Sequence, residues 1–160
     1  LGLALMLAPV AVWIALRGQV VMENPLDLTP ALLLGLAVFF WVAGFDIIYS
    51  CQDIEFDSKQ GLHSIPARLG IDGALKTAAA SHFTMIVILA ILPSVAVAAG
   101  VPTGLNWLYC LTVAAVAALL IYEHWLVRPD DLTRVNIAFF NVNAIVSFAL
   151  FTAGSIDALL

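Results

Sequence analysis

The chain has 160 residues, of which 63% are hydrophobic and only 11% are charged. Soluble domains carry roughly a quarter charged residues, so this composition excludes an ordinary water-soluble fold and indicates a membrane protein. Acidic residues outnumber basic ones by 11 to 6. This balance excludes nucleic acid as a partner, because no basic surface is available to neutralise a phosphate backbone.

Long apolar segments recur at the length needed to cross a bilayer core, which is about 20 residues. We therefore predict an all-α fold, a polytopic transmembrane helix bundle with five spans. The spans are expected at 1–16, 31–50, 76–99, 104–126 and 135–155. The chain opens inside an apolar segment, with neither an initiator Met nor a charged region ahead of it. We expect it to be the C-terminal part of a longer protein.

The basic residues predict how the bundle is oriented. Five of the six Lys and Arg residues flank the loop 51–75 or the loop near 130, and only Arg17 lies on the other side. The positive-inside rule then predicts that both loops are cytoplasmic. Aromatic residues at both ends of the fourth span, Tyr109 among them, are typical of interfacial belts.

The stretch CQDIEFDSKQG, residues 51–61, concentrates charge in a chain that otherwise avoids it. If the second span continues as a helix past residue 50, Asp46, Asp53 and Asp57 lie within about 40° of one another on one face, and Glu55 points away. Carboxylates on one face repel unless a cation joins them, and hard oxygen ligands suit Mg²⁺ shared with a substrate phosphate. The alternative is a solvated acidic helix end at the membrane surface.

Residues 44–70, GFDIIYSCQDIEFDSKQGLHSIPARLG, resemble the second aspartate-rich motif of the UbiA superfamily of intramembrane prenyltransferases. The shared pattern is D-x6-D-x3-D-x3-G followed by a Ser-x-Pro-x-x-x-Gly tail. It is closest to the branch related to 4-hydroxybenzoate polyprenyltransferase and its menaquinone-pathway relatives. The segments LAPVAVWIA and AFFNVNAIVS extend the resemblance over nearly the whole chain.

The resemblance implies a bundle of nine transmembrane helices around a central cavity, with two aspartate-rich motifs at its cytoplasmic mouth. The five spans look like helices five to nine, so residues 1–160 would be the C-terminal part of a single UbiA-type domain. The family's first motif has no counterpart in this sequence. We therefore expect the chain alone to be inactive.

The activity implied by the resemblance is Mg²⁺-dependent transfer of a polyprenyl group from an allylic prenyl diphosphate to an aromatic acceptor. A 4-hydroxybenzoate-like acceptor in ubiquinone or menaquinone biosynthesis is the first choice. Haem, chlorophyllide, dihydroxynaphthoate and homogentisate acceptors belong to other branches, and the residues do not exclude them. The protein would be a multi-pass component of a bacterial inner (plasma) membrane.

By the same resemblance, Asp53 and Asp57 are the strongest candidates for catalytic Mg²⁺ binding, and Asp46 is the next. Lys59 and Arg68 are candidates for binding diphosphate oxygens by charge-assisted hydrogen bonds. The alternative for these two cations is that they anchor the bundle at the membrane surface.

Two further substrate-binding candidates lie in the spans. Tyr49 falls close to the aspartate face and could line the substrate path, with core packing as the alternative. Asn141 is a candidate for lining the substrate cavity, whereas helix–helix hydrogen bonding is favoured for Asn143. His82, Glu123 and His124 fall near cytoplasmic helix ends, where polar residues are tolerated, and we assign them no chemistry.

Three other functions are alternatives to prenyl transfer. A transporter or cation-binding protein could use the same aspartates, but transport sites usually lie at mid-membrane with broken helices. A CDP-alcohol phosphotransferase also has aspartates spaced four apart, but its Asp-Gly-x-x-Ala-Arg motif is not matched, since Asp72-Gly73 is followed by ALKT. An assembly subunit is a third possibility, and the intact aspartate pattern gives no reason to prefer it.

Overall fold

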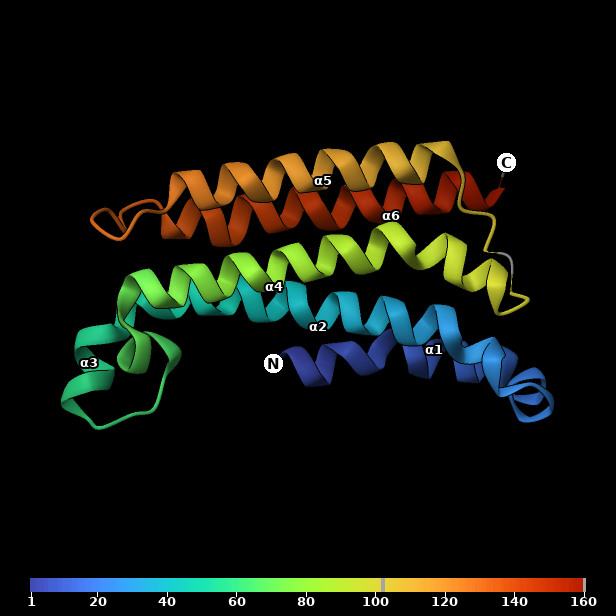
Figure 1. The fold of residues 1–160 in the computed structure, drawn as a ribbon, viewed down its shortest axis with the longest axis horizontal. Coiled ribbons are helices and arrows are strands. Elements are labelled where there is room, and N and C mark those ends of the chain that lie inside the picture. Colours follow the sequence, from blue (N-terminus) through green and yellow to red (C-terminus); the bar gives the residue numbers. More distant parts are fainter. Residues whose placement is uncertain (102, 160) are drawn as a thin grey trace.

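The computed structural model describes residues 1–101 and 103–159 of the chain as an antiparallel bundle of long helices (Figure 1). The long helices are α1 (Gly2–Glu23), α2 (Thr29–Ser50), α4 (Ile65–Ala98), α5 (Trp107–Leu126) and α6 (Asn143–Leu159). Five helical segments are long and apolar enough to cross a membrane. The prediction of an all-α bundle with five spans is confirmed, and the chain is an integral membrane protein.

Short elements connect the long helices. They are the 3₁₀ turns η1 (Pro25–Leu28) and η2 (Cys51–Asp53), the short helix α3 (Ile54–Lys59), and the π-helix η3 (Ile137–Val142), which leads into α6. Within the described residues, β-structure is limited to one isolated bridge between Arg128 and Asp131.

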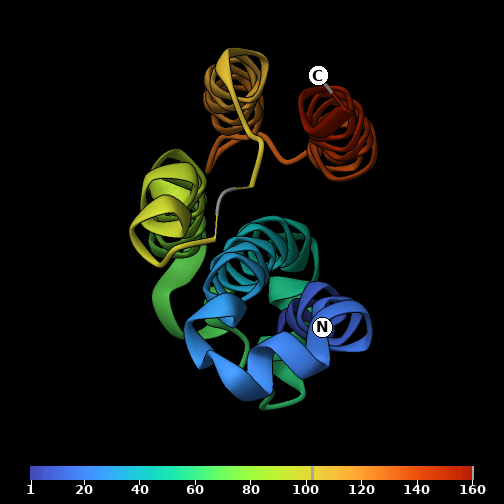
Figure 2. The same cartoon turned by 90° about the vertical axis from the view of Figure 1, so that its right-hand side faces the viewer.

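Viewed along their axes, the long helices follow an arc from α1 through α2, α4 and α5 to α6 (Figure 2). Helix α2 packs against α1 and α4, and α5 packs against α4 and α6. The α3 segment and the loop 127–136 lie at one end of the bundle, and the turn between α1 and α2 lies at the other (Figure 1). This grouping of the two charged loops agrees with the sequence analysis, while the side of the membrane they face stays a prediction.

Small residues allow α2 and α4 to approach closely. Ala37 on α2 and Ala74 and Ala78 on α4 are almost completely buried. Gly44 on α2 lies directly against the His82 ring of α4, where any Cβ would overlap the imidazole. Small residues at helix contacts are typical of membrane bundles, in which packing replaces the hydrophobic effect as the driving force.

The first span has a kink at Arg17, directly after the residue where the span was predicted to end. Arg17 has non-helical backbone angles (φ −128°, ψ 15°), and a second helical segment of α1 continues from there to Glu23. The Arg17 guanidinium donates to both carboxylate oxygens of Asp27, at 2.9 and 2.6 Å, and the Trp13 indole donates to the same carboxylate at 2.9 Å. Asp27 is only 2% exposed, so the η1 turn is held against α1 by a buried polar contact.

Tyr109 is not part of an interfacial belt, and that expectation is wrong. Its side chain is buried, and its hydroxyl donates to the Leu89 carbonyl of α4 at 2.9 Å. Pro93 lies four residues after Leu89 and has no N–H, so the usual helical donor to this carbonyl is missing. The Tyr109 hydroxyl replaces it. Trp107 and Trp125, at the two ends of the same helix, are exposed as predicted for a belt.

Candidate functional site

The helix that carries Asp46 does not continue unbroken through the acidic stretch. Helix α2 ends at Ser50, the 3₁₀ turn η2 follows, and α3 begins at Ile54. A 3₁₀ turn advances about 120° per residue instead of about 100°, so it rotates the later aspartates relative to Asp46. The predicted face of three aspartates required an unbroken helix from Asp46 to Asp57. The structure meets this requirement only in part.

Two of the three aspartates line one pocket. Asp46 and Asp53 border a cavity of about 430 Å³ together with Tyr49, and His63 and Ser64 from the following loop complete its polar wall. The pocket lies where α2 passes into η2, with the start of α1 and the start of α4 as its other walls. Asp46 and Asp53 are both exposed, so their carboxylates are available to a ligand.

The remaining predicted residues lie around this pocket and do not line it. Asp57 is half-buried on α3. Lys59 shares a second cavity, of about 480 Å³, with Asp53, and its ammonium lies 3.8 Å from the Glu55 carboxylate. Arg68 is exposed at the start of α4. The 3.8 Å ion pair is exposed and long, which leaves Lys59 able to bind another anion.

Asn141 lies farther along the chain, in η3, with an exposed side chain. Its neighbour Asn143 bridges two helices, since it accepts a hydrogen bond from the Trp41 indole at 2.8 Å and donates to the Phe139 carbonyl at 2.7 Å. The helix–helix hydrogen bonding predicted for Asn143 is confirmed.

The glycine that closes the aspartate pattern has a conformational role. Gly61 has φ +67° and follows α3. The Leu62 amide donates to the Asp57 carbonyl at 2.8 Å, and the Gly61 amide donates to the Ser58 carbonyl at 3.4 Å. These two bonds form the Schellman motif that ends many helices, and it requires a residue with positive φ. Gly61 thus turns the chain back toward the pocket.

The Ser-x-Pro-x-x-x-Gly tail starts and then bends helix α4. Ser64 accepts a hydrogen bond from the Ala67 amide at 3.3 Å as the N-cap, and Pro66 occupies the first turn, where its missing N–H leaves no helical bond unmade. Gly70 has φ +72° and separates this first turn from the rest of α4. Helix α4 therefore begins at Ile65 but is broken at Gly70, and its continuous part starts after Gly70, a few residues before the start predicted at 76.

An aromatic column extends from the pocket along α2. Trp41, Phe45 and Tyr49 are spaced four residues apart, so they lie on one face of the helix. Phe139 of η3 packs against this face, with ring centroids 5.3 Å from Phe45 and 4.4 Å from Tyr49. The sequence analysis identified Tyr49 and missed Trp41, Phe45 and Phe139. The four-residue spacing of Trp41 and Phe45 from Tyr49 was a signal in the sequence, and Phe139 had no such signal.

The loop 127–136, at the same end of the bundle as this pocket, is ordered by polar contacts within the loop. Thr133 donates to Asp131 through its amide at 3.0 Å and its hydroxyl at 2.6 Å. Side-chain and backbone hydrogen bonds from Thr133 lower the pKa of the Asp131 carboxyl, because they stabilise its charged form. Arg128 and Arg134 border a cavity of about 290 Å³ here, which gives this end of the bundle two further cations.

The carboxylate oxygens of the pocket can hold a divalent cation only if a bound ligand also coordinates that cation. Within residues 1–101 and 103–159, no three His, Cys, Asp or Glu side chains converge on a metal position. Mg²⁺ is commonly held by one or two carboxylates together with waters and substrate phosphates, and Asp46 and Asp53 are such a pair. The donor set therefore suits Mg²⁺ in complex with a phosphorylated substrate.

Comparison with known proteins identifies the family. The model of the UbiA prenyltransferase family matches residues 1–145. The chain belongs to the UbiA prenyltransferase family. A 4-hydroxybenzoate octaprenyltransferase from Alkalilimnicola ehrlichii is 32% identical over 113 residues, which cover 71% of this chain and 36% of that protein. The apo structure of a UbiA homolog from Aeropyrum pernix K1 matches 80% of this chain and 42% of its own, at 36% identity and a TM-score of 0.63.

The chain spans less than half the length of either relative. Its match to the solved homolog covers 80% of its residues, so the fold described above is a UbiA fold over the region that they share.

Proposed function

We propose that the protein carrying this chain transfers a polyprenyl group from an allylic prenyl diphosphate to an aromatic acceptor, with 4-hydroxybenzoate as the first candidate. The observation that carries the proposal is the pocket in which Asp46 and Asp53 lie beside Tyr49 at the end of an apolar bundle. Family membership and the name of the octaprenyltransferase relative support the same reaction.

In the proposed reaction, the bond between the allylic carbon and the diphosphate oxygen breaks, and a carbon–carbon bond forms to the acceptor ring, which then releases a proton. Asp46 and Asp53, with Asp57 close by on α3, would hold Mg²⁺. A divalent ion there offsets the negative charge of the departing diphosphate. Lys59 and Arg68 would bind diphosphate oxygens by charge-assisted hydrogen bonds.

The apolar part of the site would hold the prenyl chain and keep water from the reacting carbon. A cavity of about 520 Å³ lies between α1, α2 and the η3–α6 segment, and Trp41, Phe45 and Phe139 are among its walls. The aromatic column reaches from this cavity to Tyr49 in the acidic pocket. Tyr49 and Asn141 are the side chains proposed to contact substrate along this path.

The product would serve quinone biosynthesis, either ubiquinone or menaquinone, in a bacterial inner membrane. The acidic pocket is proposed to face the cytoplasm, since α3 lies at the same end of the bundle as the 127–136 loop (Figure 1). Lys59 ends α3, Arg68 and Lys76 follow near the start of α4, and the loop carries Arg128 and Arg134. This orientation would give the pocket access to a water-soluble acceptor and diphosphate.

The test uses membranes that contain the complete gene product, supplied with geranyl diphosphate and 4-hydroxybenzoate, and measures prenylated product by mass spectrometry. We expect activity with Mg²⁺ and none with excess EDTA. Asp53→Asn should lower the rate roughly 100-fold or more, because a charge that stabilises the leaving group is lost. Asp57→Asn tests the predicted ligand that lies outside the pocket. Asp130→Asn, in the exposed 127–136 loop, is the matched control.

Unchanged turnover in both Asp53→Asn and Asp57→Asn would remove the central role of the acidic pocket. Turnover that persists in EDTA would contradict the proposed role of the metal, and the transferase proposal would be unaffected. Each variant is first checked for insertion and helix content, so that a loss of rate is not confused with a loss of fold.

A further inference from the structure

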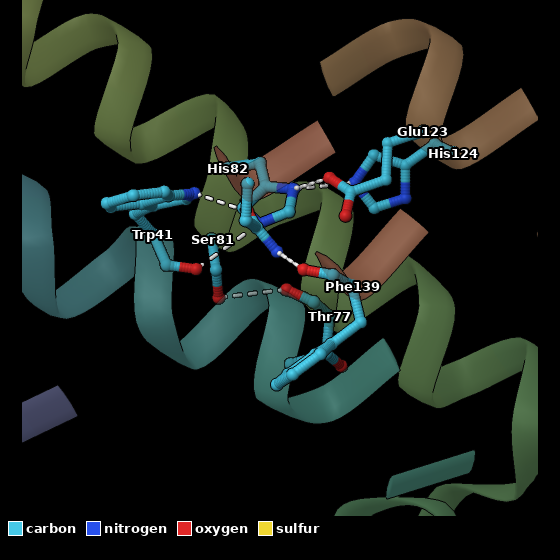
Figure 3. Close-up of polar contacts among 8 residues, drawn as sticks. Trp41, Thr77, Ser81, His82, Glu123, His124 and Phe139 are labelled. Atoms are coloured by element: carbon cyan, nitrogen blue, oxygen red, sulfur yellow. Dashed lines mark hydrogen bonds and ion pairs between the residues drawn. The ribbon is translucent and has the colours of Figure 1, made fainter. Parts of the chain in front are cut away.

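A second polar cluster, made of residues that do not line the acidic pocket, lies where α4 and α5 meet inside the bundle (Figure 3). His82 on α4 is 2% exposed, and Glu123 on α5 is completely buried. His124, the next residue of α5, is half-buried against them. The sequence analysis placed these residues at tolerant helix ends, but their burial shows that the fold encloses them. Ionisable groups enclosed in a membrane bundle are rare and are functional candidates.

The hydrogen bonds fix which nitrogen of His82 carries a proton. His82 Nε2 lies 3.3 Å from the Trp41 carbonyl, and a carbonyl only accepts, so Nε2 is the protonated nitrogen. His82 Nδ1 lies 3.0 Å from His124 Nε2. If His82 is neutral, Nδ1 is an acceptor and His124 donates to it. If His82 is an imidazolium, Nδ1 donates to His124.

Glu123 has no hydrogen-bond partner on either carboxylate oxygen. Its closest ionic contact is His82 Nδ1, 3.5 Å from Oε2, which is within ion-pair range but too long for a strong hydrogen bond. Over residues 1–101 and 103–159, no Lys or Arg forms an ion pair with it. An ionised carboxylate buried without a partner is very unfavourable, so the protonation state of Glu123 is linked to that of His82.

Counting protons then leaves one net charge for the cluster. Its electrically neutral forms are a carboxylic acid beside neutral His82 and His124, or a carboxylate beside an imidazolium on His82 or His124. Each form holds one proton more than the fully deprotonated cluster of a carboxylate and two neutral imidazoles. Removing that proton leaves a buried anion facing a nitrogen lone pair, and adding another leaves a buried imidazolium without a counterion.

Among the described residues, the other elements around the cluster supply no charge that changes this count. Helix α2 presents the Trp41 carbonyl and Gly44, and α6 presents the Asn143 amide through Trp41. His82 on α4 and Glu123 and His124 on α5 are the titratable groups that meet there.

The cluster is connected to the wall of the 520 Å³ cavity. His82 bonds to the Trp41 carbonyl, the Trp41 indole donates to Asn143, and Asn143 donates to the Phe139 carbonyl. Trp41, Phe139 and Asn143 all border that cavity. A shift of His82 would therefore change the contact between α2 and the η3–α6 segment.

We propose that Glu123, His82 and His124 form a proton-binding site inside the membrane bundle, which holds one proton shared among the Glu123 carboxylate and the two imidazoles. The bound proton keeps His82 against the Trp41 carbonyl and so holds Trp41 and Asn143 in place on the cavity wall. His82 and its partners on α5 are positioning residues in this role. The proposal does not depend on which reaction the protein catalyses.

The experiment uses the complete gene product in nanodiscs, with ¹⁵N-labelled histidine and tryptophan. At neutral pH, infrared and NMR spectra should show one shared proton on the cluster: a protonated Glu123 with both histidines neutral, or an ionised Glu123 with one of the two histidines doubly protonated. Raising the pH should remove the proton and shift the Trp41 indole N–H resonance. Glu123→Gln keeps the shape without a titratable group, so its indole resonance should not move over the same pH range.

Three results would overturn the proposal. One is an ionised Glu123 with both His82 and His124 neutral at neutral pH, and another is a Trp41 response to pH that is the same in the wild type and in Glu123→Gln. The third is a stoichiometric transition metal that is lost in His82→Ala. If Glu123→Gln does not fold, the wild-type proton count still decides. Glu55→Gln, which changes an exposed carboxylate, is the matched control.

Discussion

Replacing Tyr109 with Phe removes a single hydroxyl that satisfies a backbone carbonyl freed by a proline. The hydroxyl lies 2.9 Å from the Leu89 carbonyl, and Pro93 cannot donate to that carbonyl. Loss of a partner from a buried acceptor costs about 1–3 kcal/mol in soluble proteins, whereas hydrogen bonds in membrane bundles contribute about 0.6 and at most about 1.7 kcal/mol. Since Tyr109 is only 6% exposed, water cannot easily replace it.

We therefore expect Tyr109→Phe to lower the free energy of unfolding by about 1–2 kcal/mol, which raises the unfolding equilibrium constant roughly 5- to 30-fold. The measurement is equilibrium unfolding of the complete gene product in mixed detergent micelles, followed by circular dichroism. Tyr122→Phe is the matched control, because the Tyr122 side chain is 47% exposed. It should change the free energy by less than about 0.5 kcal/mol.

A second background separates the missing hydrogen bond from general packing. Pro93→Ala restores an N–H at the position that bonds the Leu89 carbonyl in a regular helix. In that background Tyr109→Phe should lose clearly less stability than in the wild type, so the double-mutant cycle should show coupling above about 0.5 kcal/mol. Equal losses in both backgrounds would refute the idea that Tyr109 compensates for Pro93.

Two further substitutions test close packing and capping, both by the same unfolding assay. Gly44→Ala should destabilise the bundle by about 1–3 kcal/mol, because the added Cβ overlaps the His82 ring, whereas Gly154→Ala has open space around it and should be nearly neutral; equal effects would contradict the packing argument. Asp157→Ala should lose about 1–3 kcal/mol, since Asp157 accepts hydrogen bonds at 2.8 and 2.7 Å from two backbone amides at the start of α5. Asp157→Asn keeps an acceptor and should lose less, and an equal loss would count against capping.

The five spans were predictable because each one is a long apolar segment, and the bilayer sets its length. Their ends were less accurate where a polar residue is satisfied inside the fold. Helix α1 kinks at Arg17, close to the predicted end of the first span, and Asp27 pairs with the guanidinium where a second helical segment continues to Glu23. The beginning of α4 was missed because the sequence shows Ser64 as one residue of a motif, and the structure shows it as a helix cap.

The candidate site was predictable in composition and only in part in geometry. The spacing of Asp46, Asp53 and Tyr49 correctly predicts that they lie close together, since all three line one pocket. The same spacing assumed an unbroken helix to Asp57, and a 3₁₀ turn intervenes. The approach of Phe139 could not be predicted, because it depends on how η3 packs against α2 across nearly a hundred residues of sequence.

Polar side chains inside this bundle specify how its helices fit together. Lipid tails are as apolar as the helix surfaces, so burial of apolar area does little to select one helix arrangement over another. The bonds from Trp41 to Asn143 and from Tyr109 to Leu89 each join two helices at one register. A sliding or rotated arrangement would leave these groups unpaired in an apolar medium, where the penalty is largest. Among the described residues, Glu123 lacks a partner on both buried carboxylate oxygens, whereas Asp157 lacks one only on Oδ1. A proton shared with the neighbouring histidines makes the Glu123 cluster electrically neutral.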